Sequence, residues 1–135
     1  MWFPKTASIG YTEGDVVSFT SPTASTGRVV LWTSDTTAAV FGVNRSSVAS
    51  TDTTTNDIAV EVPDSPYTEW LFDVDSDAGL VDSDVGLYVD VDTNSDVDRS
   101  SSVDDTVLVT ARISASQGVG IFARTAIYKA GGTIA

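Results

Sequence analysis

Hydrophobic and polar residues alternate with a period of two along most of the chain. In the segment EWLFDVD, for example, Trp70, Phe72 and Val74 occupy one set of alternate positions, whereas Asp73 and Asp75 occupy the other. Successive side chains of a β-strand point to opposite faces of a sheet, so this pattern predicts strands with one apolar face. No helical stripe is longer than about ten residues. The predicted strands span residues 16–20, 28–33, 39–43, 58–62, 69–74, 85–91, 107–113 and 119–128.

A second alternating run occupies residues 85–91. Its apolar positions are expected on one face of a strand: Val85, Leu87, Val89 and Val91. Its aromatic and acidic positions are expected on the other face: Tyr88, Asp90 and Asp92. The intervening SDAGLVDSD is interpreted as a hairpin connection, so the strands at 69–74 and 85–91 are predicted to be neighbours.

About eight short strands, separated by clusters of Gly, Asp, Ser, Thr and Pro, are typical of a β-sandwich or β-barrel. We therefore predict an all-β, single-domain fold, with the β domain at residues 14–128. Residues 1–13 and 129–135 carry Gly, Pro and small side chains and are predicted to be an extended N-terminal arm and a C-terminal tail. Residues 46–57 and 93–105, rich in Ser, Thr and Asp, are predicted loops.

Charge and composition narrow the function classes. The 135 residues include 19 acidic and 7 basic side chains, and the formal net charge is −12. The basic residues are scattered singly, so no nucleic acid partner is expected. The chain has no Cys and no His, which excludes disulfides, the commonest general base and the commonest zinc ligand. Apolar residues are too dispersed for a membrane span, and the start, MWFPKTASIG, lacks a run of signal-peptide length, so neither membrane insertion nor export is expected.

A calcium loop is one interpretation of the Asp-rich segment. Positions one, three, five and twelve of an EF-hand loop would be filled by Asp73, Asp75, Asp77 and Asp84. Position six, however, is Ala78 instead of Gly, position twelve is Asp instead of Glu, and no helix flanks the loop. A looser site that includes Asp82 or Asp90 stays open. The favoured interpretation is a solvated strand face, and no cofactor is predicted.

Catalysis is not predicted, because Ser has no His partner and no G-x-S-x-G elbow occurs. A glycosidase pair drawn from carboxylates such as Glu61 and Glu69 is conceivable, but a pair of unknown separation among 19 acids carries almost no information. A sugar-stacking platform could be formed by Trp32, Tyr67, Trp70 and Tyr88. Alternation places Trp70 in the core, which leaves Tyr67 and Tyr88 as exposed candidates. An extracellular calcium- or carbohydrate-binding β module is therefore the alternative to the function described below.

The predicted N-terminal arm carries two large apolar rings, Trp2 and Phe3, outside any predicted strand. Burying both contributes roughly 10 kcal/mol at most, whereas ordering about ten arm residues costs on the order of 10 kcal/mol. The arm would thus need strand pairing, or several copies acting together, to hold a partner. The candidate contact residues are Trp2, Phe3, Lys5, Tyr128 and Lys129.

Seven segments resemble, in order and spacing, the head decoration (cement) proteins of tailed bacteriophages: GDVVSFTS, FGVN, IAVEVP, EWLFDVDS, SDVGLYVDV, VDRSSSVDD and ISASQGVGIF. The resemblance covers roughly residues 14–123. Such proteins are small β-rich domains that sit on the outside of the capsid lattice, often as trimers, and brace the shell. The resemblance implies a non-enzymatic structural protein of the outer virion surface, made in the host cytoplasm. Its implied partners are the major capsid protein and neighbouring copies of itself in a homotrimer.

Overall fold

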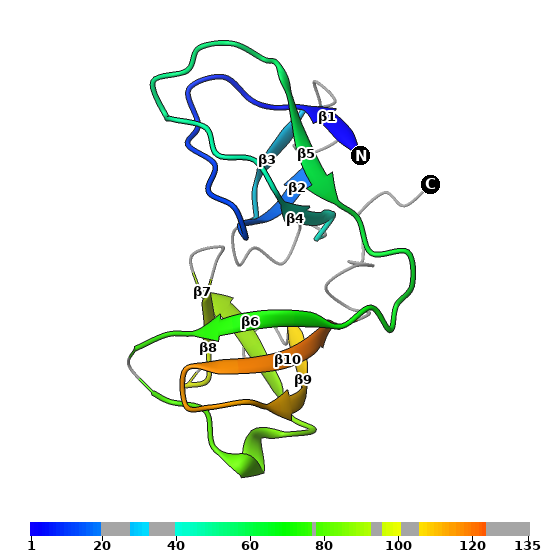
Figure 1. Cartoon of the computed structure of the whole chain (residues 1–135), viewed down its shortest axis with the longest axis vertical. Coiled ribbons are helices and arrows are strands. Elements are labelled where there is room, and N and C mark those ends of the chain that lie inside the picture. The colour runs from blue at the N-terminus through cyan, green and yellow to red at the C-terminus, as the bar shows by residue number, and fades with distance from the viewer. Residues whose placement is uncertain (20–27, 33–39, 77, 93–95, 101–105, 124–135) are drawn as a thin grey trace.

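The computed structural model is all-β, as the sequence predicts, with ten strands and one short 3-10 helix in the part of the chain that the structure describes (Figure 1). That part consists of residues 1–19, 28–32, 40–76, 78–92, 96–100 and 106–123. The N-terminal half forms an open sheet, and the C-terminal half forms a closed barrel (Figure 1).

The first sheet is antiparallel throughout, with the strand order β1–β5–β4–β2–β3. Its strands are β1 (Trp2–Pro4), β2 (Val16–Phe19), β3 (Val29–Leu31), β4 (Gly42–Asn44) and β5 (Asp57–Glu61). An isolated bridge between Lys5 and Val29 connects the chain after β1 to β3, so the sheet curls round its own core. The buried residues of this core are Tyr11, Val17, Val29, Ile58 and Val60.

The barrel has the strand order β10–β6–β8–β7–β9 and closes by pairing of β9 with β10. Its strands are β6 (Trp70–Val74), β7 (Tyr88–Asp92), β8 (Asp96–Asp98), β9 (Val107–Arg112) and β10 (Gln117–Phe122). Strands β6 and β8 are parallel, whereas the other pairs are antiparallel. The 3-10 helix η1 (Asp82–Asp84) precedes β7. Full closure leaves no free edge in this sheet.

One buried cluster joins the two sheets. It combines Val16, Trp32, Val40 and Val43 of the first sheet with barrel residues such as Val89. Because both sheets bury side chains in the same cluster, the described chain forms a single domain, which confirms that part of the prediction.

The alternation predicted for β6 is confirmed, since Trp70, Phe72 and Val74 pack against the buried cluster. The alternation predicted for residues 85–91 is wrong in its first half, and Asp90, expected on a solvated face, is 5% exposed. Val85 and Leu87 are exposed by 44% and 54%, respectively, because η1 and a positive φ of 90° at Gly86 delay the strand until Tyr88.

The predicted hairpin between β6 and β7 is also wrong. Strand β8 lies between them in the barrel, although it falls inside the loop predicted at residues 93–105. Its short sequence, DVD, contributes a single apolar residue, Val97, which is 2% exposed. Strand β8 needs only one buried Val because it is paired on both sides. A single apolar residue, however, shows no alternation that could predict a strand from the sequence.

Residues 1–13 do not form an extended arm. Residues 2–4 form β1, which pairs with β5 in the register Trp2 to Ala59, Phe3 to Ile58 and Pro4 to Asp57. Tyr11 is 1% exposed and forms a bridge with Val48. The N-terminal segment is therefore part of the domain, because strand pairing supplies the energy that two rings alone would not.

Candidate functional site

A pocket of about 550 Å³ lies between the two sheets and is lined by residues of both. Its apolar lining consists of Val16, Val43, Trp70, Leu71, Phe72, Val91, Val97, Val107, Ile121 and Phe122. Pockets of this size accept small ligands or side chains of a partner. We call this cavity the inter-sheet pocket.

Six charged residues surround the inter-sheet pocket: Glu13, Arg45, Glu61, Glu69, Asp73 and Asp96. Arg45 neutralises one of the five carboxylates, since its Nε donates a hydrogen bond of 2.7 Å to Glu61 Oε2. No ion pair among the described residues involves the other four. We call these four, Glu13, Glu69, Asp73 and Asp96, the acidic rim.

Local structure positions the acidic rim on two opposing walls. On the first sheet, Glu13 lies in a tight turn, in which the Thr12 amide donates to Asp15 Oδ2 at 2.7 Å and Gly14 has a φ of 99°. Burial raises the pKa of the Asp15 carboxyl. On the barrel, Asp73 of β6 is paired in register with Asp96 of β8.

Neutral hydrogen-bond donors hold two rim carboxylates in place. Thr110 Oγ1 donates to Glu69 Oε1 at 3.1 Å, and Gln117 Nε2 donates to Asp73 Oδ1 at 3.3 Å. Neither donor carries a charge, so both contacts orient the carboxylates and leave their negative charge uncompensated.

The four aspartates considered for calcium do not form a shared site in the described chain, where no group of three or more acidic residues could hold a metal ion. Asp84 is buried, and its Oδ2 accepts hydrogen bonds of 2.8 Å from the Val81 amide and from Arg99 Nε. Asp82 pairs with Arg112 at 3.4 Å. Asp73 belongs to the acidic rim, Asp75 follows β6, and Asp77 lies outside the described residues.

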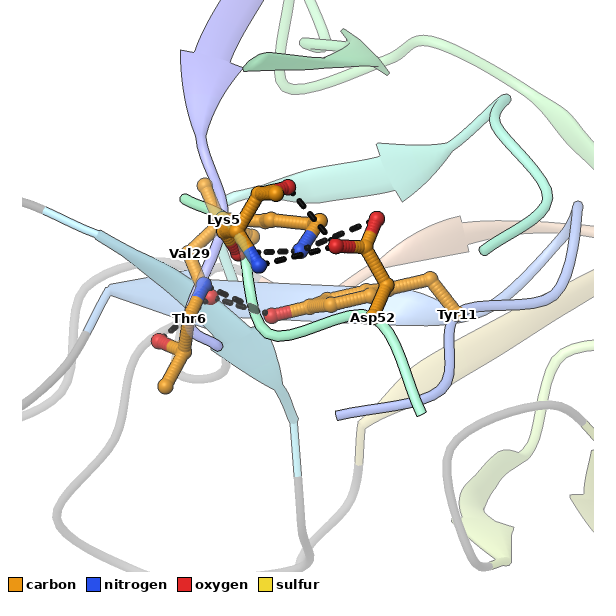
Figure 2. Close-up of polar contacts among 6 residues, drawn as sticks. Lys5, Thr6, Tyr11, Val29 and Asp52 are labelled. Carbon is orange, nitrogen blue, oxygen red and sulfur yellow. Dashed lines mark hydrogen bonds and ion pairs between the residues drawn. The ribbon is translucent and has the colours of Figure 1, made fainter. Parts of the chain in front are cut away.

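Lys5, predicted to contact a partner, is 1% exposed, so that prediction is wrong. Its Nζ donates to the Thr54 carbonyl and lies 3.5 Å from Asp52 Oδ2 (Figure 2). The Asp52 carboxylate also accepts hydrogen bonds of 2.7 Å from Thr54 Oγ1 and 2.8 Å from the Thr54 amide. These two bonds, and then the Lys5 ammonium, lower the pKa of the Asp52 carboxyl. Lys5 thus fastens β1 to the segment before β5.

The other predicted contact residues have different positions. Phe3 packs in the first core and meets Phe41 edge-to-face, with ring centroids 4.8 Å apart, so its ring belongs to the fold. Trp2 points outward and is 69% exposed, which leaves it available to a partner. Tyr128 and Lys129 lie outside the described residues.

Tyr11 joins the turn near Lys5 to β3 (Figure 2). Its hydroxyl donates to the Val29 carbonyl at 2.6 Å and accepts from the Thr6 amide at 3.2 Å. Burial raises the pKa of the Tyr11 phenol above its ordinary value.

Because the folded-state pKa of Tyr11 is raised, its contribution to stability is present below about pH 10, the ordinary value, and is lost as the pH rises through the folded-state pKa. We expect Tyr11→Phe to flatten the alkaline limb of the stability curve, at a cost of about 1 kcal/mol at neutral pH. The cost is small because the Thr6 amide and hydroxyl still donate to the Val29 carbonyl. Urea unfolding between pH 7 and 11 checks this, with the exposed Tyr67→Phe as the control; an unchanged alkaline limb in Tyr11→Phe would contradict it.

The aromatic residues do not assemble into one platform. Trp32 is 0% exposed, and Trp70 packs against Phe122 with centroids 5.7 Å apart, which confirms Trp70 as a core residue. Tyr67 and Tyr88 are exposed, as expected, but Tyr67 lies between β5 and β6 and Tyr88 begins β7.

A second surface covers the outside of the barrel. Two cross-strand rows follow from the strand register, and both are apolar. The first row is Leu71, Val119 and Ala111, on β6, β10 and β9. The second row is Ile121, Leu108 and Tyr88, on β10, β9 and β7. We call these six residues the outer apolar band; Leu71 and Tyr88 are its most prominent members, with 63% and 46% exposure.

Comparison with protein-family models, curated proteins and solved structures finds no match for this chain. Across the described ranges, no helix has the length and apolar character needed to cross a membrane. Two surfaces are therefore candidates for binding a partner: the inter-sheet pocket with its acidic rim, and the outer apolar band, which meet at Leu71 and Ile121.

Proposed function

We propose that this protein is a non-enzymatic structural protein that binds the outer surface of a bacteriophage capsid and stabilises the shell. The observation that carries the proposal is the outer apolar band, six apolar residues in adjacent rows on a closed barrel. An exposed apolar patch with acidic neighbours such as Glu69 and Asp73 is typical of a protein interaction surface. The resemblance to decoration proteins supplies the kind of partner.

The energetics fit attachment in many copies. Burial of Leu71 and Tyr88 contributes roughly 1.5 to 3 kcal/mol each, which is modest against the cost of association. Repetition over a lattice and contacts within a homotrimer turn such weak contacts into strong attachment. A net charge of −12 favours repulsion between decorated particles.

Trp2 supplies a second candidate contact. It is 69% exposed on β1, which is the edge strand of the first sheet. Edge strands carry unpaired backbone groups that can pair with a neighbouring chain. In the proposed assembly, β1 and Trp2 contact a neighbouring copy or the capsid protein, while the barrel presents the outer apolar band.

The test uses undecorated capsids assembled from the major capsid protein of the same genome. Wild-type protein is expected to add density to the outer lattice in electron micrographs and to co-sediment with the shells. The double variant Tyr88→Glu/Ala111→Glu places two charges in the band, and we expect its affinity to fall about tenfold or more. Tyr67→Glu changes an exposed tyrosine outside the band and is the control. Bare shells at saturating wild-type protein would refute the proposal.

A further inference from the structure

We propose that the inter-sheet pocket is a binding site for Lys or Arg side chains carried by an extended segment of a partner protein. The pocket shares Leu71 and Ile121 with the outer apolar band, but the proposed site depends on the acidic rim, which is not part of the band. It starts from the combination of a cavity of about 550 Å³, an apolar lining and an acidic rim.

The apolar lining selects for an aliphatic stem. Val16 and Val43 of the first sheet line the pocket together with Leu71 of β6. Leu71 lies between Glu69 and Asp73 on the same face of its strand. Lys and Arg are the side chains that bury a long hydrocarbon stem while keeping a charged head at the surface.

The acidic rim selects for positive charge. Its four carboxylates have no cationic partner among the residues that the structure describes, and the hydrogen bonds to Glu69 and Asp73 come from neutral groups. An anionic ligand would be repelled, and a neutral one would leave the carboxylates uncompensated. Charge complementarity therefore favours a cationic segment.

The distribution of the rim carboxylates favours a chain with spaced charges over a single ion. Glu13 lies on the first sheet, whereas Glu69 and Asp73 lie on the barrel, and the described acidic residues form no metal-type cluster. Glu69 directly precedes β6 and Asp73 lies within it, so the two residues are four positions apart in extended chain, which corresponds to roughly 13 Å. An extended partner segment with basic residues four positions apart has the same spacing.

The arrangement defines a probe peptide. Alternate residues of an extended chain point to the same side. The acetylated and amidated pentapeptide KAVAK therefore presents two lysines and a central valine to one face. Its neutral and acidic counterparts, QAVAQ and EAVAE, have the same length and the same valine.

The experiment is a titration of the isotope-labelled protein with each peptide, followed by NMR. The indole signal of Trp70, assigned with Trp70→Phe, and the amide signals of Val43 and Val97 are expected to shift with KAVAK and not with QAVAQ or EAVAE. In Glu69→Gln/Asp73→Asn, the affinity is expected to fall about tenfold. The control Asp57→Asn/Asp64→Asn removes the same charge outside the pocket and is expected to bind like the wild type.

The outcomes separate the two proposals. Tyr88→Glu/Ala111→Glu, which changes the outer apolar band alone, should bind KAVAK with wild-type affinity even where it fails to bind capsids. Equal shifts with QAVAQ, or KAVAK shifts that avoid the pocket residues, would overturn the proposed site. So would the absence of any shift at millimolar peptide.

Discussion

Lys5→Ala is expected to lower the free energy of unfolding by about 3 kcal/mol. Lys5 is 1% exposed, and its stem fills space between β1, β3 and the segment before β5. The substitution leaves a cavity and removes the Nζ donor from the Thr54 carbonyl. Urea or guanidinium unfolding at neutral pH measures the loss.

Lys5→Met is the matched control, because Met keeps most of the volume but loses the charge. Its cost should be only about 1 kcal/mol, since the side chain of Asp52 is 34% exposed and water can replace the ammonium there. If Met proves as costly as Ala, the ion pair and hydrogen bond outweigh the packing. If neither substitution lowers the free energy of unfolding, the proposal that Lys5 stabilises the contact between β1 and the segment before β5 is contradicted.

Gly120→Ala should destabilise the barrel by about 2 to 3 kcal/mol. A Cβ at this position would lie 2.6 Å from Val107 Cγ1, 2.8 Å from the Leu108 carbonyl oxygen and 3.0 Å from the Phe72 ring. Two of these neighbours belong to β9, so the methyl group would push β9 and β10 apart where they close the barrel. Thermal and denaturant unfolding measure the effect.

Two controls make this prediction specific. Gly14→Ala has no atom within 4 Å of the new Cβ but a φ of 99°, so it should cost about 1 kcal/mol through backbone strain alone. Combining Gly120→Ala with Val107→Ala should cost less than the sum of the two, because Val107 is one of the clashing groups. Strict additivity, or a smaller effect at Gly120 than at Gly14, would contradict the steric explanation.

The strands with several alternating apolar residues were predictable from the sequence. Strand β6 is the best example, because Trp70, Phe72 and Val74 form an uninterrupted apolar face. Strands β1 and β8 were missed for the opposite reason. Each has three residues, which is too short for a recognisable alternation. Strand β1 is held by pairing with the distant β5, and β8 by pairing with the adjacent β7 and with β6.

Buried charged residues were the least predictable feature. Lys5 and Asp84 are 1% and 5% exposed, although isolated charged residues in polar segments are usually solvated. Each is buried with a partner far along the chain, Asp52 and Arg99, respectively. A pairing over such distances is visible only once the strands are placed, so the calcium interpretation and the contact role of Lys5 could not be tested earlier.

The candidate surfaces were only partly accessible to sequence reasoning. Exposure of Tyr88 was predicted and Trp2 was a candidate contact residue, but the two apolar rows of the outer band depend on the register of four strands. The inter-sheet pocket depends on residues as distant as Glu13 and Phe122. Neither surface corresponds to a continuous motif.

The sequence alone determined the β class, the single domain, the apolar face of β6 and the strongly acidic surface, because period-two alternation and charge are local properties of a chain. The tertiary structure decided which sheet closes into a barrel, which charged residues are buried and where acids from two sheets surround one cavity. These features arise from pairing between distant segments, whose energy depends on register and packing and leaves no mark in any short stretch of residues.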